Sequence, residues 1–408
     1  MKILQVLCGG AWGGGSVVVL HNIEALIRRG DEVWVITADD EQTRCFQRVG
    51  ATVVQLRSWR RHISPRDVVP FVQLFRLCRR EKFDLVATHT SKAGFIGRLA
   101  AKAAGVRHVV HHAHGFAFRE TQPKWVQRCY VFLERIAAHA CDLIISVSED
   151  HRQAGIRKRV ACADKIVTVL NGIELDAFGR TSVQVERGKL GFEAEDVLIG
   201  VAGRFAPKKG LEDLIRAFPE IHKAHPKARL VLVGDGPSRP GLEKIAQRIQ
   251  LGRQIHFTGF RNDIPDLLSA FDVVVQPSIS EGLSLSIIEP MAAGKPIVAC
   301  NIEGNREIIT SRVNGLLVPP SDPAALAAAV GLLLKDPEYA RALGKAAQDD
   351  CRERFSKARM VRQTVKLYDV VAAGKPVNDS LRAWRIQEVF AQHQAAGEEL
   401  VQMGGRRV

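Results

Sequence analysis

Short apolar runs of strand character alternate with helical patterns through the first 170 residues, and the same alternation starts again near residue 197. The strands expected in the first part are 2–7, 32–37, 52–56, 85–88, 106–111 and 143–147. Those expected in the second part are 197–202, 229–233, 255–257, 273–276 and 296–299. Strands that alternate with helices are joined by parallel crossovers. The sequence therefore predicts an α/β protein with two doubly wound sheets.

A turn signal at Asn171–Gly172 separates the two halves of this pattern. We expect an N-terminal domain of residues 1–171 and a C-terminal domain of residues 172–355. A helix at 356–372 is expected to pack back on the first domain, and the tail 373–408 is polar and weakly patterned. Ligands of doubly wound sheets bind at the carboxyl ends of the strands, so two facing domains would place a cleft between them.

Apolar runs and cysteine spacing argue against several classes of protein. No apolar run approaches the ~18 residues that a membrane span needs, and the first run is shorter than the core of a signal peptide. The eight cysteines show no C-x-x-C spacing and no clustered His and Cys ligands, so we expect reduced thiols and no structural zinc. We therefore expect a cytoplasmic protein.

The formal charge of +14 is concentrated in the first half of the chain. Residues 1–173 carry 26 Lys and Arg against 15 Asp and Glu, whereas residues 174–408 carry 32 against 29. This asymmetry favours a membrane, a nucleic acid or a phosphorylated substrate as partner, although a solvated surface would give the same count. Aromatic residues among basic ones at 59–80 and 124–132 favour peripheral docking on the inner face of an anionic membrane. No basic repeat, zinc finger or RNA-recognition signature supports nucleic-acid binding.

The stretch 276–296 joins a buried strand to a helix expected to begin at residue 284. Glu281 falls in the loop before this helix, and Glu289 falls inside it. The backbone N–H groups expected at the helix start are those of Gly282, Leu283 and Ser284. Such an end binds anions, while a carboxylate accepts hydrogen bonds from sugar hydroxyls. The pattern favours a nucleotide sugar with its sugar near Glu281 and its ribose near Glu289; the alternative is a helix cap beside a solvated acid.

Loops after the first strand of each domain favour contacts to phosphate. Glycines occupy positions 13–15, where bare backbone can approach a phosphate or sugar closely or can simply make a tight turn. The dinucleotide fingerprint G-x-G-x-x-G is not met there, although Asp39 lies near the end of the second strand. In the second domain, the loop 203–210 carries Arg204 and two lysines that can reach the same diphosphate. A solvated basic loop is the alternative.

Two strand ends of the first domain carry polar groups suited to a sugar or an anion. The segment HHAHGF contains His111, His112 and His114, and one of them could orient or polarise a sugar hydroxyl, although a lone histidine is usually structural. At another strand-to-helix junction, Ser91 can cap the helix and Lys92 can meet an anion. A plain helix cap is the alternative there.

Several short motifs occur in an order that is more specific than any one of them. They are Gly203-Arg204 with Lys209-Gly210, then Val233-Gly234-Asp235-Gly236, then Glu281 and Glu289 with seven residues between them. This ordered set resembles the retaining glycosyltransferases of family four, and Gly14-Gly15 and the Asn171-Gly172 turn fit the same plan. The resemblance covers roughly residues 1–370. It implies the GT-B fold, in which two Rossmann-like domains face each other across a cleft.

The resemblance also implies a role for each motif. Arg204 and Lys209 would bind the donor diphosphate. Glu281 would contact the transferred sugar, and Glu289 would contact the ribose. His114 would be the histidine near the reacting atoms. The further residues implied for donor binding are Gly14, Gly15, Phe260, Arg261, Gly282, Leu283 and Ser284.

The acceptor is indicated by a second resemblance within the same family. Capsule and exopolysaccharide transferases carry a segment similar to H-T-x-K-A-G, which occurs in this chain around Ser91 and Lys92. Their acceptor is a sugar on polyprenyl diphosphate. The resemblance therefore implies that Ser91 and Lys92 bind a lipid-linked or other saccharide acceptor.

The implied reaction is transfer from a nucleoside diphosphate sugar, with UDP expected from family frequency, and with retention by front-face attack of the acceptor. Arg, Lys and helix dipoles would stabilise the leaving diphosphate. Because the chain has no Asp-x-Asp motif, we expect neither a metal nor another cofactor. The alternatives are a nucleotide-sugar 2-epimerase on the same fold, a transferase with a soluble acceptor, and an inactive sugar-binding relative.

Overall fold

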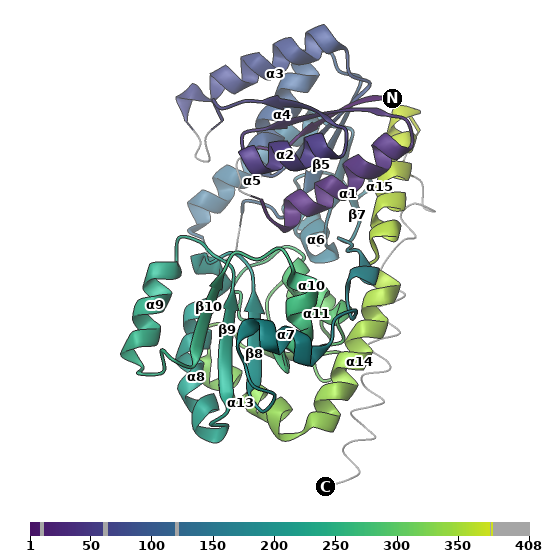
Figure 1. Cartoon of the computed structure of the whole chain (residues 1–408). Helices are drawn as coiled ribbons and strands as arrows, with labels where there is room; N and C mark the ends of the chain where they lie inside the picture. Colours follow the sequence, from purple (N-terminus) through teal and green to yellow (C-terminus); the bar gives the residue numbers. More distant parts are fainter. Residues whose placement is uncertain (9–11, 60–63, 119–121, 376, 378–408) are drawn as a thin grey trace. The chain divides into compact units, whose positions relative to one another are not determined.

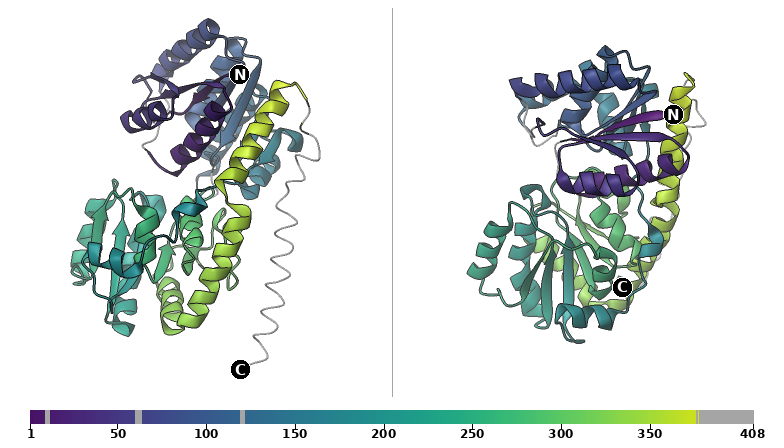
Figure 2. Two further views of the ribbon diagram at one scale, coloured as in Figure 1. Left: turned by 45° about the vertical axis from the view of Figure 1, so that its right-hand side comes forward. Right: turned by 45° about the horizontal axis from the view of Figure 1, so that its top comes forward.

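The computed structural model describes residues 1–8, 12–59, 64–118, 122–375 and 377. The chain forms two compact units (Figures 1 and 2). The first contains residues 1–172 together with the helix α15 (Lys357–Ala372), and the second contains residues 173–356. Gly9 and Gly10 of the glycine-rich loop and residues 60–63 of the basic aromatic segment lie outside the described residues, as does most of the tail.

The first unit is built on a parallel sheet with the strand order β3-β2-β1-β4-β5-β6-β7. Its strands are β1 (Lys2–Val6), β2 (Glu32–Thr37), β3 (Thr52–Gln55), β4 (Leu85–His89), β5 (His108–Ala113), β6 (Leu143–Ser146) and β7 (Ile166–Thr168). Besides α15, its helices are α1 (Gly14–Arg28), α2 (Asp40–Arg48), η1 (Pro65–Asp67), α3 (Val68–Glu81), α4 (Ser91–Ala103), α5 (Lys124–His139), α6 (Glu149–Arg157) and η2 (Ala163–Lys165). The order reverses between β1 and β4, where doubly wound sheets bind their ligands.

The second unit repeats this architecture with the parallel order β10-β9-β8-β11-β12-β13. Its strands are β8 (Val197–Ala202), β9 (Ala228–Val233), β10 (Ile255–Gly259), β11 (Val273–Gln276), β12 (Ile297–Cys300) and β13 (Leu316–Val318). Its helices are η3 (Leu175–Ala177), α7 (Val183–Leu190), η4 (Pro207–Lys209), α8 (Leu211–Ala224), α9 (Arg239–Arg248), α10 (Ile264–Ala270), α11 (Leu285–Ala292), α12 (Asn305–Ile308), α13 (Pro323–Lys335) and α14 (Pro337–Arg354). The two doubly wound sheets predicted from the sequence are confirmed.

The central strands are buried on both faces because helices cover both sides of each sheet (Figure 1). All residues of β4, β5, β6, β11 and β12 are buried. Apolar runs are the normal sequence of such strands. The buried polar exceptions in β1, β4, β5, β6 and β11 are Gln5, Thr88, His89, His108, His111, His112, Ser146 and Gln276. Each of them must find a hydrogen-bond partner inside the protein.

Differences from the predicted elements are confined to short or terminal segments. The three-residue strands β7 and β13 and the short helices α2, α6, α7 and α12 were not predicted. Three residues are too few to show the period of a strand. The predicted strand at 106–111 is shifted to 108–113, so His111 and His112 lie inside β5 and only His114 follows it.

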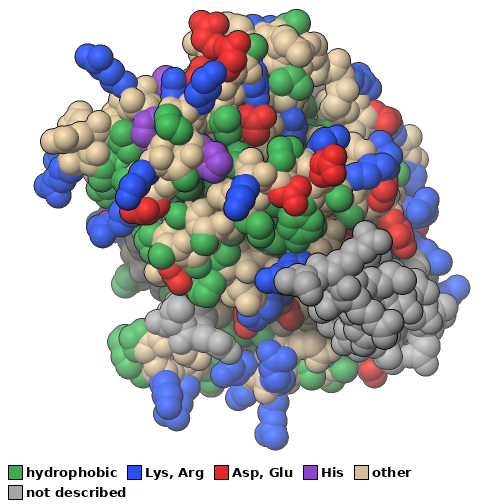
Figure 3. All heavy atoms as spheres, turned by 90° about the horizontal axis from the view of Figure 1, so that it is seen from below, with side chains coloured by type: hydrophobic (Ala, Val, Ile, Leu, Met, Phe, Trp, Pro, Cys, Tyr) green, Lys and Arg blue, Asp and Glu red, His purple; other side chains and the backbone are tan. Residues whose placement is uncertain are grey.

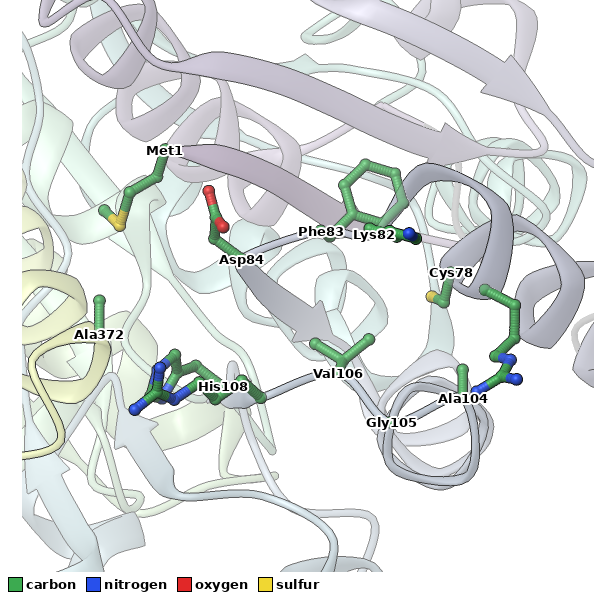
Figure 4. A pocket seen from close by; sticks show the side chains of 12 residues that line it. Met1, Cys78, Lys82, Phe83, Asp84, Ala104, Gly105, Val106, His108 and Ala372 are labelled. Atoms are coloured by element: carbon green, nitrogen blue, oxygen red, sulfur yellow. The ribbon is translucent and has the colours of Figure 1, made fainter.

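Two surface features, a pocket and the face seen in Figure 3, combine charged and apolar side chains. A pocket of about 670 Å³ lies at the amino ends of β4 and β5, lined among others by Met1, Asp84, Arg107 and His108 (Figure 4). On the face seen in Figure 3, described Lys and Arg side chains are interspersed with Asp, Glu and apolar ones. Within the described part of the chain, no helix combines the length and the hydropathy needed to cross a membrane.

Candidate active site

Three loops of the second unit meet at the carboxyl edge of its sheet, and two glycines allow them to pack closely. Gly210 has a φ of 61°, and a Cβ atom there would overlap the carbonyl oxygen of Pro277. Gly304 has a φ of 73°, and a Cβ atom there would overlap the carbonyl oxygen of Gly282. Side chains at either position would therefore push apart the loops that follow β8, β11 and β12.

Glu281 lies in this group of loops and is held by two lysines and a serine. Its Oε1 is 2.7 Å from Lys209 Nζ, and its Oε2 is 3.4 Å from Lys208 Nζ. Ser278 donates its hydroxyl hydrogen to Glu281 Oε1 over 3.0 Å. Burial alone would raise the pKa of this carboxyl group, whose side chain is only 10% exposed, but the two ammonium groups outweigh burial and lower its pKa. Glu281 is therefore an ionised carboxylate with a fixed orientation.

The serine that orients Glu281 is itself held from the end of β11. Gln276 Nε2 donates to Ser278 Oγ over 3.0 Å and approaches Ser284 Oγ at 3.5 Å. Gln276, Ser278 and Ser284 are all buried. Neither Gln276 nor Ser278 was predicted as a site residue, and the available signal was a glutamine that ends an otherwise apolar buried strand.

Glu289 lies within α11 and differs from Glu281 in its charge. Burial raises the pKa of Glu289 to about 7, and the nearby ammonium of Lys209 only partly opposes this rise. The helix begins at Leu285 with Ser284 as its N-cap, one residue later than predicted, and Ser284 makes no side-chain cap hydrogen bond. Gly282, Leu283 and Ser284 thus precede the first turn of α11.

Basic and apolar groups suited to a nucleotide lie on other loops at the same edge of this sheet. Arg204, two residues after the end of β8, is exposed and makes no ion pair among the residues that the structure describes. A Cβ atom on Gly203 would lie 3.7 Å from Lys209 Nζ and 3.5 Å from the hydroxyl of Ser286, a residue that the sequence analysis did not single out. After β10, the Phe260 ring is 57% exposed.

The predicted base-pocket arginine has a partner of its own. Arg261 Nε donates to Asp263 Oδ1 over 2.8 Å, and this carboxylate helps to raise the pKa of the arginine further. The pair fixes the direction of the guanidinium group of Arg261. The residues predicted for donor binding in the second unit thus lie on the loops after β8, β10 and β11 and, for Glu289, within the helix α11.

In the first unit, the structure brings His114 close to the glycines that open α1. His114 follows β5 and is partly exposed, whereas His111 and His112 are buried within the strand. A Cβ atom on Gly15 would lie 4.0 Å from His114 Nδ1. Gly14 and Gly15 form the first turn of α1, immediately after the loop that follows β1. His114 is therefore the one of these three histidines that can meet a ligand.

The junction between β4 and α4 differs from its prediction. Helix α4 begins at Ser91, but the N-cap position is Thr90, so the predicted capping role of Ser91 is wrong. Thr90 has a φ of 60°, and its hydroxyl donates to the Cys8 carbonyl over 3.2 Å. Non-glycine residues in such a conformation cluster at ligand sites. Lys92 Nζ lies 2.6 Å from Asp67 Oδ1 in η1, so its charge already has a partner.

Asp39, the residue that a dinucleotide site would need, has a structural role instead. It is the N-cap of α2, and its Oδ1 accepts the backbone N–H of Gln42 over 2.9 Å. Among the residues that the structure describes, no three His, Cys, Asp or Glu side chains come together as a metal-binding group.

Comparison with known proteins matches both halves of the chain. Residues 12–177 match the family described as Glycosyltransferase Family 4, and residues 182–350 match Glycosyl transferases group 1. The chain is 33% identical over 262 residues to the UDP-Gal:alpha-D-GlcNAc-diphosphoundecaprenol alpha-1,3-galactosyltransferase of Escherichia coli, covering 63% of this chain and 68% of that protein. It is 27% identical to the N,N'-diacetylbacillosaminyl-diphospho-undecaprenol alpha-1,3-N-acetylgalactosaminyltransferase of Campylobacter jejuni, covering 86% of this chain and 94% of that protein.

A solved structure has the same fold. The crystal structure of Anabaena Alr3699/HepE in complex with UDP-glucose matches with a TM-score of 0.78 at 24% identity, covering 90% of this chain and 99% of that chain. At this level of identity, the likeness concerns the fold.

Proposed function

Because the chain belongs to the group 1 and family 4 glycosyltransferases, we propose that it transfers a sugar from a UDP-sugar to a saccharide carried on polyprenyl diphosphate, with retention of configuration. The observation that carries this proposal is the ionised Glu281 held between Lys209, Lys208 and Ser278. This group lies at the carboxyl edge of the second sheet, where a doubly wound fold binds its ligand.

In this proposal the second unit binds the donor. Glu281 accepts hydrogen bonds from hydroxyl groups of the transferred sugar, and Glu289 accepts them from the ribose. Arg204 and Lys209 bind the diphosphate together with the backbone of residues 282–284, whose place before a helix N-terminus favours an anion. Phe260 offers its exposed ring to the base, with Arg261 held beside it.

The chemistry of the proposed step needs charge stabilisation on both sides of the bond that breaks. Positive charge develops on the sugar ring and negative charge on the leaving diphosphate. Arg204, Lys209 and the start of α11 stabilise the diphosphate, without a metal in this proposal. The acceptor hydroxyl attacks from the face that the diphosphate leaves, and the departing phosphate oxygen takes its proton. In the first unit, His114 and the glycines 14–15 are the proposed contacts to a sugar.

The acceptor class rests on the two curated relatives, whose names describe transfer to saccharides on diphosphoundecaprenol. In this chain, Ser91 and Lys92 at the start of α4 are the proposed acceptor contacts. Lys92 pairs with the carboxylate of Asp67, and the phosphate oxygens of a bound diphosphate could take the place of this carboxylate. A soluble saccharide, which carries no diphosphate, is the second candidate, because the charge of Lys92 already has Asp67 as its partner.

The test of the function is a transfer assay that uses UDP-sugars with saccharides on undecaprenyl diphosphate or on soluble carriers. A product with the donor's anomeric configuration, formed equally with EDTA, is the expected result. Transfer to the soluble carrier alone would overturn the lipid-linked acceptor. Interconversion of the UDP-sugar without any acceptor would overturn transfer and identify a 2-epimerase.

The helix α5 carries an exposed apolar stripe that supports peripheral membrane binding. Trp125 is 70% exposed and Phe132 is 62% exposed, and Ile136 continues the same helical face. Lys124 and Arg128 lie on the same helix. Aromatic residues among basic ones bind to anionic lipid surfaces through burial of the rings and attraction of the charges.

We therefore expect the protein to float with liposomes that contain anionic lipid and to remain behind with neutral ones. Replacing Trp125 and Phe132 by serine should lower this recovery several-fold, because both rings lose their burial in the interface. Replacing the exposed Leu332 of α13 by serine is the matched control. Equal recovery with neutral and anionic liposomes would contradict the proposed surface.

Donor affinity is expected to rise with pH through about 7. The pKa of Glu289 is about 7, and only the carboxylate can accept hydrogen bonds from both ribose hydroxyls. Between pH 8 and pH 6 the affinity for UDP-glucose should fall about tenfold, because the fraction of ionised Glu289 falls by about that factor. Calorimetric titration measures this, and Glu289→Gln should bind more weakly but without the pH dependence. An unchanged pH profile in that variant would exclude Glu289 as its source.

A further inference from the structure

Five polar residues form a continuous hydrogen-bonded chain through the core of the first unit. His114 Nε2 is 3.1 Å from His89 Nδ1, and His89 Nε2 is 2.7 Å from Gln5 Oε1. Gln5 Nε2 donates toward Tyr368 Oη at 3.5 Å, and Tyr368 Oη is 2.7 Å from His112 Nε2. The chain thus connects β1, β4, β5 and α15, and all its members except His114 are fully buried.

The three imidazole rings in this hydrogen-bonded chain, those of His89, His112 and His114, are neutral at physiological pH. Burial lowers the pKa of His114 to about 4 and that of His112 to about 3, and it lowers the pKa of His89 well below its usual value. The ring of His89 lies 4.7 Å from that of His112 and 5.4 Å from that of His114, so a charge on one ring would disfavour a charge on another. Each neutral ring has one N–H donor and one acceptor nitrogen.

These contacts assign the hydrogen of each ring in turn. The oxygen of Gln5 can only accept, so His89 carries its hydrogen on Nε2 and has a bare Nδ1. The hydrogen shared between the two rings must then come from His114 Nε2, and this leaves His114 Nδ1 bare. Nδ1 is also the atom that faces Gly15 at the start of α1.

At the other end of this hydrogen-bonded chain, Tyr368 accepts one hydrogen bond and donates the next, so no two donors face each other. Burial raises the pKa of its phenol, so the hydroxyl stays protonated and can donate to His112 Nε2. The same oxygen accepts from the amide nitrogen of Gln5, which leaves the amide oxygen of Gln5 for His89. Every contact in the chain then has one hydrogen, as buried polar networks require.

We propose that His89, oriented by Gln5, is a positioning residue that holds His114 in the Nε2–H tautomer, so that the bare Nδ1 accepts a hydrogen bond from a hydroxyl group of the bound sugar. This inference rests on the proposed function for the identity of the ligand. It defines His114 as an acceptor toward the sugar, and it excludes a role as a proton donor at that atom.

The tautomer can be measured without any activity assay. In the full-length protein labelled with ¹⁵N-histidine, long-range proton–nitrogen spectra at pH 7.5 should place His114 Nδ1 among nitrogens without a hydrogen. The His114→Gln variant identifies the signals of this residue. In His89→Leu, which removes the acceptor, His114 should become a mixture of tautomers. A hydrogen found on Nδ1 of His114 in the unaltered protein would overturn the proposal.

Kinetics of matched variants test the consequence for the reaction. His89→Leu should lower kcat about tenfold or more with little change in KM for the nucleotide sugar, a loss like that caused by removing the partner that orients a metal-bound histidine. In His89→Asn the amide oxygen can replace Nδ1 as the acceptor, so most of kcat should be retained. Failure of asparagine to restore kcat above the leucine variant would contradict the positioning role.

A buried histidine that is not part of this hydrogen-bonded chain serves as the control for loss of packing. His111 lies on the same strand as His112, and its Nδ1 is 3.0 Å from Thr88 Oγ1. His111→Leu should lower the melting temperature but leave kcat near that of the unaltered protein. An equal loss of kcat in this variant would show that packing alone explains His89. Normal transfer by His114→Ala would refute the proposed role of His114 in transfer, whereas the measured tautomer would stand independently.

Discussion

Replacing Glu281 by alanine is expected to lower kcat for transfer by about 10²–10³-fold, the effect typical of removing one preorganised electrostatic contact at a reacting centre. The carboxylate is ionised and fixed by Lys209, Lys208 and Ser278, so it needs no reorganisation when positive charge develops on the sugar. UDP should still bind, because it lacks the sugar that Glu281 contacts. A transfer assay with saturating donor measures kcat, and calorimetric titration measures the affinity for UDP.

Two controls separate this effect from loss of structure. Asp349→Asn removes an exposed carboxylate that pairs with Lys345 on α14 in the same unit, and it should leave kcat unchanged. Glu281→Gln keeps the size of the side chain, and it should lose nearly as much activity as alanine, because the neutral amide cannot stabilise positive charge. If both Glu281 variants fold, bind UDP and transfer at the normal rate, the donor site is assigned to the wrong residue.

The sequence predicted the two sheets well because their strands are buried on both faces. The ranges 32–37, 197–202 and 273–276 coincide with β2, β8 and β11, since an unbroken apolar run has clear ends. The three-residue strands β7 and β13 have no such signal and were missed. The GT-B fold inferred from the ordered motifs agrees with the solved structure that the chain matches.

The site was predicted as a set of residues but not as a set of contacts. The pairing of Glu281 with Lys209 joins loops that are 72 positions apart, and only the strand order brings these loops together. The cap position of α4 was misplaced by one residue, because Thr90 and not Ser91 is the N-cap. The ion pair of Lys92 with Asp67 in η1 likewise depends on the fold and could not be predicted from the sequence.

Polar residues inside apolar strands mark parts of the site that were not predicted. Gln5, His89 and Gln276 each interrupt or end a buried strand, where an unpaired polar group would be costly. Each of them is hydrogen-bonded, directly or through one other residue, to a predicted site residue. His89 contacts His114, and Gln5 contacts His89. Gln276 contacts Ser278, which donates to Glu281. A buried polar residue at the carboxyl end of a parallel strand is therefore a useful indicator of an oriented site.

Replacing Arg204 by alanine is expected to weaken the binding of UDP by about tenfold to a hundredfold. The guanidinium group is exposed at the end of β8 and has no ion pair among the described residues, so its donors are available to the diphosphate. A charge-assisted hydrogen bond is worth about 1.5–3 kcal/mol, which corresponds to this range. Calorimetric titration or the thermal shift produced by UDP measures the loss.

Because Arg204 contacts the phosphates and not the base, the loss must depend on the ligand. Uridine should bind to Arg204→Ala and to the unaltered protein with the same affinity, whereas UDP and UDP-glucose should lose affinity by similar factors. Arg204→Lys should recover only part of the loss, since a single ammonium cannot reproduce the forked contact of a guanidinium. The control Arg216→Ala removes an exposed arginine of α8 that pairs with Glu212, and it should not change UDP affinity. An equal loss for uridine would place Arg204 at the base or in the fold, and an unchanged affinity for UDP would leave Lys209 as the principal diphosphate contact.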